Sequence, residues 1–313
     1  MTVVTSVPAV ALVGPTASGK SALAHQLARD SDESVEILCV DAMTVYRGMD
    51  LATAKPTLRE RADVRYHLLD LVAPNEEFTV AQYQRAARVA LHDVANRSHG
   101  ALYVGGTGLY GRAVLDDLAI PAQYPGVRAL LDARAESDLP ALYEELRQLD
   151  PVAAARMEPT NSRRVVRALE VTLGAGRPFS SYGEGLRHYG PVRVIQVALE
   201  TDFEQLDERI ARRFRDWMEQ GLLDEVTSLA AAPGGLGRTA RQAVGYRELL
   251  RHVEEGADLE SCVEDAIIQS RRLARRQRSW FLRDPRIEWF TSPVDAAERL
   301  REVLNGFVND VRE

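Results

Sequence analysis

Cysteine is scarce in this 313-residue chain, which has only Cys39 and Cys262. Two thiols so far apart match neither the paired ligands of a zinc site nor a disulfide framework. Cys39 falls in the apolar run 35–40, which predicts a buried thiol. No apolar run approaches the roughly 18 residues of a membrane span, and the first residues lack the basic region of a secretory signal. We therefore expect a cytoplasmic protein without a membrane partner.

Lysine is almost absent: of the 39 basic residues, only Lys20 and Lys55 are lysine. A base-composition bias in the genome explains this pattern, and the abundant alanine supports that explanation. Arginine is also suited to planar contacts with phosphate. The net charge of −7 argues weakly against nucleic-acid binding by the chain as a whole, so the local placement of arginines matters more.

One segment near the N-terminus fits the phosphate-loop pattern G-x-x-x-x-G-K-[ST]: Gly14, Pro15, Thr16, Ala17, Ser18, Gly19, Lys20 and Ser21. The apolar run 9–13 precedes it and predicts a strand, and residues 22–29 have helical spacing. In such a strand–loop–helix unit the loop amides and the helix start attract a phosphate. Lys20 adds a positive charge, and the Ser21 hydroxyl can bind Mg²⁺. The motif does not reveal which phosphate is held.

Further apolar runs alternate with helical patterns along most of the chain. Strands are predicted at 35–40, 66–71, 101–104, 192–200 and 287–290. Helices are predicted at 79–97, 203–220, 224–231, 241–255, 259–282 and 294–308. This alternation predicts an α/β fold with a P-loop NTPase-like parallel sheet flanked by helices.

Residues 116–189 have a different pattern, with short proline-punctuated helices at 127–136, 141–148 and 162–173 and no strand. We interpret this stretch as an all-helical insertion domain. The core would then consist of residues 1–115 and 190–313.

Two of the predicted strands end in polar or glycine-rich residues. Asp41 follows the strand 35–40, at the end where parallel sheets bind ligands, although a lone Asp there is equally a cap or turn former. The loop 42–56 mixes hydroxyl, basic and aromatic residues and is typical of contacts rather than core. The strand 101–104 is followed by Gly105-Gly106-Thr107 and lacks the acidic residue of a Walker B strand. This argues against a motor-type ATPase and less strongly against a small-molecule kinase.

Two arginine clusters are candidates for RNA contact. The first is Arg163, Arg164 and Arg167, which fit a solvated helix face as well as a nucleic-acid contact. The second cluster lies in and just after the helix 259–282 and contains no acidic residue: Arg271, Arg272, Arg275, Arg276, Arg278 and Arg283. A stripe this basic in an acidic protein predicts an electrostatic surface for nucleic acid.

Taken together, these segments resemble the bacterial tRNA dimethylallyltransferase (tRNA isopentenyltransferase, or IPP transferase) family. The similar stretches span nearly the whole chain and keep the family order. They are GPTASGKS (14–21), DAMTVYRGMDLATAKP (41–56), HLLDL (67–71), VGGTGLY (104–110), NSRRVVRALEV (161–171), QAVGYREL (242–249) and RRLARRQRSWF (271–281). Ala52 departs from the glycine that is common in the family.

The resemblance implies transfer of a dimethylallyl group from dimethylallyl diphosphate to N6 of the adenosine at position 37 of tRNA. The phosphate loop would hold the donor diphosphate with Mg²⁺ on Ser21, and Asp41 would accept the N6 proton. Thr107 and Arg128 would line the channel where donor and acceptor meet. The remaining implied tRNA contacts are Asp41, Ala42, Met43, Thr44, Arg163, Arg164, Val165, Val166 and Arg167. The insertion would grip the anticodon loop, and nothing in the sequence demands more than a monomer.

Two other functions also fit the phosphate loop. A small-molecule or nucleotide kinase would bind ATP there, with Asp41 as the base toward a hydroxyl group. A nucleotide-switched RNA-binding protein would use the loop and the arginines without group transfer. The DDxxD motif of typical prenyl synthases is missing, since Asp116-Asp117 is followed by Ile120 where the pattern needs Asp. Whether ATP competes at the loop is left open by the sequence.

Overall fold

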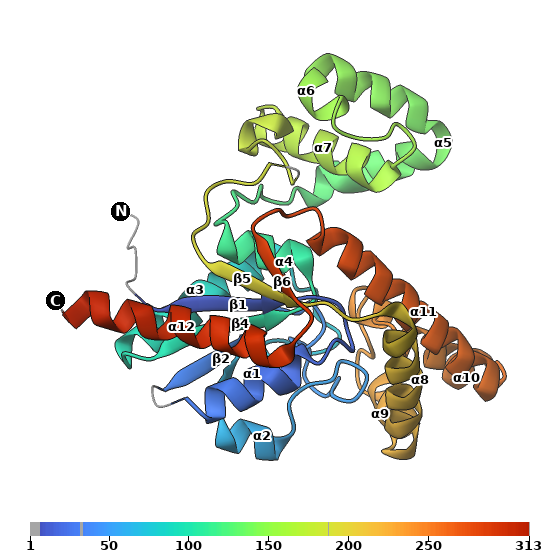
Figure 1. Ribbon diagram of the computed structural model, residues 1–313. Coiled ribbons are helices and arrows are strands. Elements are labelled where there is room, and N and C mark those ends of the chain that lie inside the picture. Colours follow the sequence, from blue (N-terminus) through green and yellow to red (C-terminus); the bar gives the residue numbers. More distant parts are fainter. Residues whose placement is uncertain (1–6, 32–33, 187, 313) are drawn as a thin grey trace. The chain divides into compact units, whose positions relative to one another are not determined.

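The computed structural model describes residues 7–31, 34–186 and 188–312. The chain forms two compact units (Figure 1). One unit is made of residues up to Asp116 together with those from Pro191 onward, and the other is Asp117–Gly190. In the part of the chain that is described, no helix is long and apolar enough to cross a membrane.

The first unit is built on a parallel sheet with the strand order β3-β2-β4-β1-β5-β6. The strands are β1 (Ala9–Val13), β2 (Val35–Cys39), β3 (Tyr66–His67), β4 (Gly100–Gly105), β5 (Ile195–Leu199) and β6 (Ile287–Phe290). The predicted parallel α/β fold is confirmed. Helices connect successive strands, as a parallel sheet requires.

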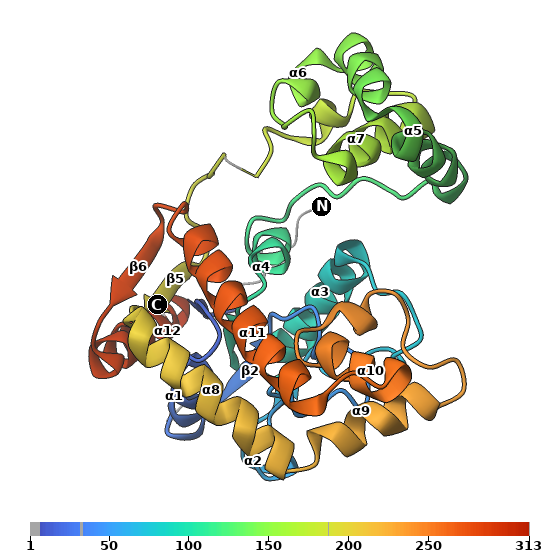
Figure 2. The ribbon, with the colours of Figure 1, turned by 90° about the vertical axis from the view of Figure 1, so that its right-hand side faces the viewer.

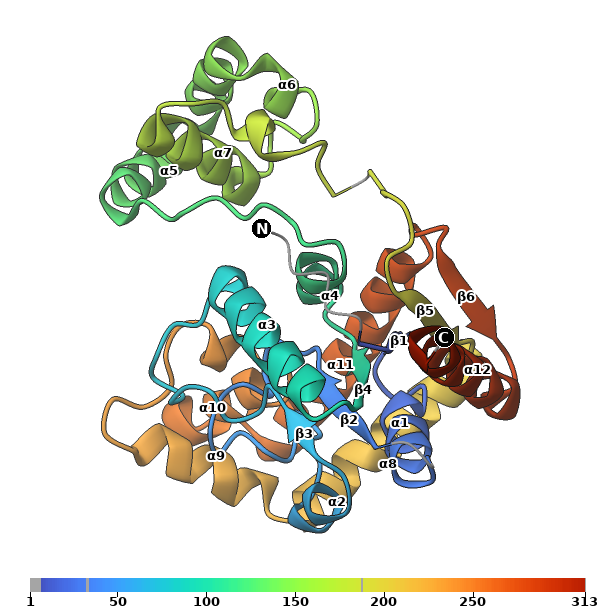
Figure 3. The ribbon, with the colours of Figure 1, turned by 90° about the vertical axis from the view of Figure 1, so that its left-hand side faces the viewer.

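Helices cover both faces of this sheet, so its strands are continuous apolar runs rather than alternating ones. Val10 and Leu12 of β1 join one core with α1 (Lys20–Arg29) and α12 (Pro293–Arg312). Ala11 and Val13 face the opposite core, which α3 (Val80–Asn96) and α4 (Gly108–Leu115) cover (Figure 3). Neither α4 nor the short α2 (Leu58–Asp63) was predicted from the sequence.

The remaining helices of this unit lie between β5 and β6 in the sequence. They are α8 (Phe203–Glu219), α9 (Leu222–Ala231), α10 (Tyr246–Glu255) and α11 (Leu259–Phe281). Helices α8 and α11 pack side by side (Figure 2). The predicted helix 241–255 is interrupted: a 3₁₀ turn at Ala240–Gln242 precedes α10, and Gly245 between them has a φ of 95°. That backbone conformation is open to glycine and ends a regular helix.

The second unit is helical, with α5 (Pro125–Leu149), α6 (Pro151–Ala154), α7 (Ser162–Ala175) and a 3₁₀ turn at Phe179–Tyr182. Leu131, Leu142 and Leu146 of α5 pack against the apolar side of α7 and form a separate core. The two helices predicted at 127–136 and 141–148 are the halves of α5. Asp138 breaks the helical conformation between them, two residues before Pro140.

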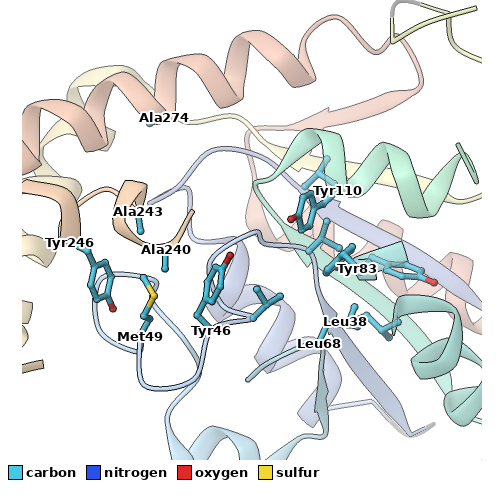
Figure 4. Packing of buried hydrophobic residues seen from close by; sticks show 14 of the residues in the cluster. Leu38, Tyr46, Met49, Leu68, Tyr83, Tyr110, Ala240, Ala243, Tyr246 and Ala274 are labelled. Carbon is cyan, nitrogen blue, oxygen red and sulfur yellow. The ribbon is translucent and has the colours of Figure 1, made fainter. Parts of the chain in front are cut away.

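The sequence interpretation was wrong for the segment 66–71 and for the middle of the loop 42–56. Only Tyr66–His67 forms a strand, because the backbone of Leu68 turns into the left-handed region with a φ of 66°. Val45, Tyr46 and Met49 of the loop are fully buried, and Figure 4 shows Tyr46 and Met49 within the larger core cluster. These side chains are core, not ligand contacts.

Lys55, at the end of that loop, is also buried. Its Nζ donates hydrogen bonds to the Tyr46 carbonyl oxygen (2.5 Å), to Asp50 Oδ1 (2.7 Å) and to Asp70 Oδ1 (2.6 Å). Two carboxylates and a carbonyl group thus compensate the cation for the loss of water. Lys55 therefore fixes the shape of the loop that begins at Asp41.

Candidate active site

The sheet topology brings three sequence segments together at the carboxyl ends of the central strands. Strand β4 pairs with both β1 and β2, with Val13 opposite Gly105 and Cys39 opposite Val104. The carboxyl ends of the three strands are therefore adjacent. The phosphate loop, Asp41 and the segment Gly105–Thr107 leave the sheet together, at the kind of edge where α/β proteins bind ligands.

The phosphate loop has the backbone conformation that its glycines predict. Gly14 has a φ of 138° and Gly19 a φ of 94°, and α1 begins immediately afterwards at Lys20. A cavity of about 310 Å³ lies beside the loop, lined by Ala17, Gly19, Lys20, Ser21, Ala22, Arg209 and Arg213. Ser18 Oγ is buried without a hydrogen-bond partner. The loop thus offers a helix start, a cation and an unused hydroxyl group.

Three cations border this cavity, Lys20, Arg209 and Arg213, and the pKa values of Lys20 and Arg213 are lowered. Burial lowers the pKa of Lys20 to about 8, with a further contribution from Arg213, while Asp41 opposes the shift. Burial likewise lowers the pKa of Arg213 to about 10. Arg213 Nη2 donates a hydrogen bond to Thr16 Oγ1 (2.6 Å), and its Nε is buried without a partner. Charged groups that have lost water in this way favour an anion as their neighbour.

Sequence reasoning missed Arg209 and Arg213. They come from α8, nearly 200 residues after the phosphate loop. The only signal in the sequence is an arginine-rich helix, and nothing in it separates Arg213 from Arg212. The position of α8 beside the phosphate loop decides which arginine reaches the cavity.

Asp41 lies next to this cavity and acts first as a turn former. Its Oδ1 accepts hydrogen bonds from the amides of Met43 (2.7 Å) and Thr44 (3.4 Å). Its Oδ2 accepts a 3.4 Å bond from the hydroxyl of Thr107, which in turn accepts from the Ala42 amide (3.1 Å). Asp41 can therefore serve both as a turn former and as a ligand-facing residue. Its Oδ1 holds the loop, and its Oδ2 makes only a long hydrogen bond.

Burial raises the pKa of Asp41, against the effect of the amide hydrogen bonds and of Lys20. A carboxylate with a raised pKa is a stronger base. Gly105 permits the close approach of Val40, the residue before Asp41, since a Cβ on Gly105 would lie 1.9 Å from the Val40 carbonyl oxygen. The arrangement can accept a proton beside an anion site.

The implied tRNA contacts of the insertion fall into three groups. Arg128 and Arg167 both pair with buried Glu170, at 3.6 and 2.8 Å. Arg163 and Arg164 are exposed at the start of α7. The third group, Val165 and Val166, is fully buried in the core of the unit. The structure thus contradicts RNA contact by these two valines, because no surface of theirs is accessible.

The arginine stripe of α11 is divided by its neighbours. Arg275 binds Asp207 at 2.8 Å and Arg278 binds Glu200 at 2.7 Å, and both guanidinium groups lie over the ring of Phe203. Arg271 also approaches Asp207. The other three are exposed and have no ion pair among the residues that the structure describes: Arg272, Arg276 and Arg283. About half of the predicted basic surface is therefore neutralised within the protein.

Comparison with known proteins identifies relatives over most of the chain. The family model of IPP transferase matches residues 44–284. A "tRNA dimethylallyltransferase" of Kineococcus radiotolerans is 44% identical and covers 96% of this chain and 97% of its own length. One of Salinispora arenicola is 46% identical over 94% of this chain and 86% of its own length.

Solved structures agree with this result. A tRNA isopentenylpyrophosphate transferase of Bacillus halodurans is 31% identical, with a TM-score of 0.69 over 97% of this chain and 99% of the other. A eukaryotic dimethylallyltransferase acting on tRNA has a TM-score of 0.77 over 96% of this chain and 80% of its own. At 24% identity it bears on the fold alone. From the match of the family model and the identity to curated relatives, the chain belongs to the IPP transferase family.

Proposed function

We propose that this protein transfers a dimethylallyl group from dimethylallyl diphosphate to N6 of the adenosine at position 37 of tRNA. The products are N6-isopentenyladenosine and diphosphate, and the protein acts as a monomer. The observation that carries the proposal is a cationic phosphate cavity beside a half-buried carboxylate, in a chain of this family. One group receives the leaving diphosphate and the other removes the proton from the attacking amine.

On the donor side, the diphosphate occupies the cavity at the phosphate loop. Lys20 and Arg213 neutralise charge that grows on the leaving oxygen as the bond to the allylic carbon breaks. The unpartnered Nε of Arg213, a residue that lines the cavity, offers a further hydrogen bond. Fixed donors of this kind stabilise the transition state without reorganising during the reaction.

Mg²⁺ fits the same cavity. Among the described residues, no three His, Cys, Asp or Glu side chains come together as a metal site, and the exposed Ser21 hydroxyl lines the cavity. A single protein hydroxyl suits Mg²⁺, which takes most of its ligands from phosphates and water. Ser21 would hold the ion, and the ion would neutralise part of the diphosphate charge.

On the acceptor side, Asp41 Oδ2 accepts the N6 proton and Thr107 keeps the carboxylate in place. Adenine N6 becomes reachable when the base leaves its stack and enters a pocket, as in other base-modifying enzymes. The segment Ala42–Thr44 contacts this nucleotide, and Arg128, which belongs to the insertion, contacts the tRNA. The insertion grips the anticodon loop through Arg163, Arg164 and Arg167, while the exposed arginines of α11 face the RNA backbone.

The test is incubation with unmodified tRNA and labelled dimethylallyl diphosphate, followed by mass analysis of the nucleosides. Isopentenyladenosine supports the proposal. Phosphoryl transfer from ATP, without isopentenyladenosine, would indicate a small-molecule or nucleotide kinase. Tight RNA binding without any product would indicate an RNA-binding protein that is switched by a nucleotide.

Asp41→Asn tests the base directly. We expect turnover to fall by about 100- to 10,000-fold, since a positioned general base contributes that much, with tRNA affinity nearly unchanged. Asp63→Asn, which changes an exposed carboxylate on α2, serves as the matched control. Full turnover of the Asp41→Asn protein would exclude Asp41 as the base.

A further inference from the structure

Gln277 of α11 lies between the two loops of the active site. Its Oε1 accepts a hydrogen bond from the Thr16 amide (2.8 Å) in the phosphate loop, 261 positions away in the sequence. Its Nε2 lies against Gly106, where an added Cβ would be only 2.5 Å away. One side chain thus contacts both the loop of the donor site and the segment that carries Thr107.

The helix α11 packs directly on this second segment. Trp280, one helical turn after Gln277, lies over Gly108, where a Cβ would come within 2.1 Å of the indole Nε1. Gln277 and Trp280 lie on the same side of the helix because they are three residues apart. Gly106 and Gly108 therefore allow α11 to approach the start of α4 closely, which fixes the position of the loop between them.

The phosphate loop is held at Thr16 from two sides. Gln277 accepts from its amide, and Arg213 donates to its hydroxyl oxygen (2.6 Å). The Thr16 amide is therefore used by the protein itself and not by a phosphate. These bonds hold the loop in shape before the donor arrives, which lowers the cost of ordering it on binding.

We propose that Gln277 is a positioning residue that fixes the spacing between the diphosphate cavity and the Asp41–Thr107 pair. This inference rests on the proposed function. Direct transfer requires the amine nitrogen and the allylic carbon to meet at about 3–3.5 Å with aligned orbitals. The cavity sets the place of the carbon and Asp41 sets that of the amine, and Gln277 is the side chain that bonds one loop and contacts the other.

Gln277→Met is the direct test, because methionine keeps the length of the side chain and loses both polar atoms. Since a shift of about 1 Å costs on the order of 100-fold, we expect kcat to fall by about 10- to 100-fold. Donor KM should change less, by under about threefold, because Arg213 still holds Thr16 in the variant. The melting temperature should stay close to that of the wild type. Ser279→Ala, on an exposed position of the same helix, is the matched control and should leave kcat unchanged.

A double-mutant cycle with Gly106→Ala adds an independent measurement. The new methyl group would displace the Gln277 amide from its place beside Thr16. It would also lie 3.2 Å from the Gly14 carbonyl oxygen, a contact that is the same in both backgrounds. Gly106→Ala should therefore lower kcat strongly in the wild-type background and much less in the Gln277→Ala background. Equal effects in both backgrounds would overturn the proposal.

The wild-type protein, assayed in parallel, separates the possible failures. Wild-type kcat in Gln277→Met, with wild-type product formation, overturns the positioning role and leaves the proposed function intact. Loss of kcat only together with a lowered melting temperature shows a packing role and also overturns it. No product from the wild type overturns the proposed function and with it this inference.

Discussion

Lys20 makes donor binding depend on pH in a direction that the structure determines. Burial and the neighbouring Arg213 lower its pKa to about 8, so the free protein loses this proton in mildly alkaline solution. A bound diphosphate next to the ammonium group favours the charged form and raises the pKa again. Binding must therefore take up a proton wherever free Lys20 is partly neutral, and affinity falls as the pH rises through the pKa of the free protein.

The size of the effect follows from linkage. With a free pKa of about 8 and a much higher bound value, affinity should fall by about eightfold between pH 7.5 and pH 9. Proton uptake should rise from about 0.2 to about 0.9 per donor over the same range. Arg213, whose pKa is about 10, stays charged in this interval, and the donor diphosphate is already fully ionised.

Titration calorimetry in two buffers with different ionisation enthalpies measures both quantities, with dimethylallyl diphosphate and Mg²⁺ as ligands. Lys20→Met is the control, because its weaker binding should show neither the pH dependence nor the proton uptake. A flat affinity between pH 7.5 and 9 in the wild type, without proton uptake, would refute the placement of Lys20 at the diphosphate.

Two further changes test the RNA surface and the loop. Replacing Arg163 and Arg164 together by Gln should weaken tRNA binding and reduce the slope of log K against log salt by about 1.5, because each lost phosphate contact removes about 0.7–0.9. An unchanged slope would make them an ordinary solvated face. Lys55→Met should lower the free energy of unfolding by about 2 kcal/mol in urea, since the Lys55 side chain is 1% exposed and its removal leaves Asp50 without its ion pair, while Asp70 keeps Arg61. Arg59→Met, at an exposed site, should leave the urea midpoint unchanged, and an equal midpoint for both variants would contradict a role of Lys55 in fixing the loop.

Local patterns in the sequence predicted the core strands and the phosphate loop. The glycines of 14–21 and the helix start that follows allow a pattern of eight residues to predict the loop, although Gln277 and Arg213 also hold it at Thr16. Runs such as 9–13 and 35–40 are apolar throughout because both faces of the sheet are covered, and this makes them visible without an alignment. The segment 66–71 has the same composition, but only two of its residues pair, because the turn at Leu68 ends the strand.

Charge could not be assigned from the sequence alone. The stripe of α11 reads as uniformly basic, yet Asp207 and Glu200 lie beside it and neutralise part of it. The valines at 165 and 166 lie between arginines in the sequence, but helical geometry turns them into the core. Neighbours in sequence thus differ completely in what they can contact.

By itself the sequence determined the family, the phosphate loop and the acid at Asp41, because each depends on residues that are close together along the chain. Only the tertiary structure brought Arg213 and Gln277 to Thr16, across 197 and 261 positions. Their places are set by how α8 and α11 pack against the sheet, and that packing depends on the whole core rather than on any local pattern. The contacts that complete the site are long-range, and for this reason they became visible only in the folded chain.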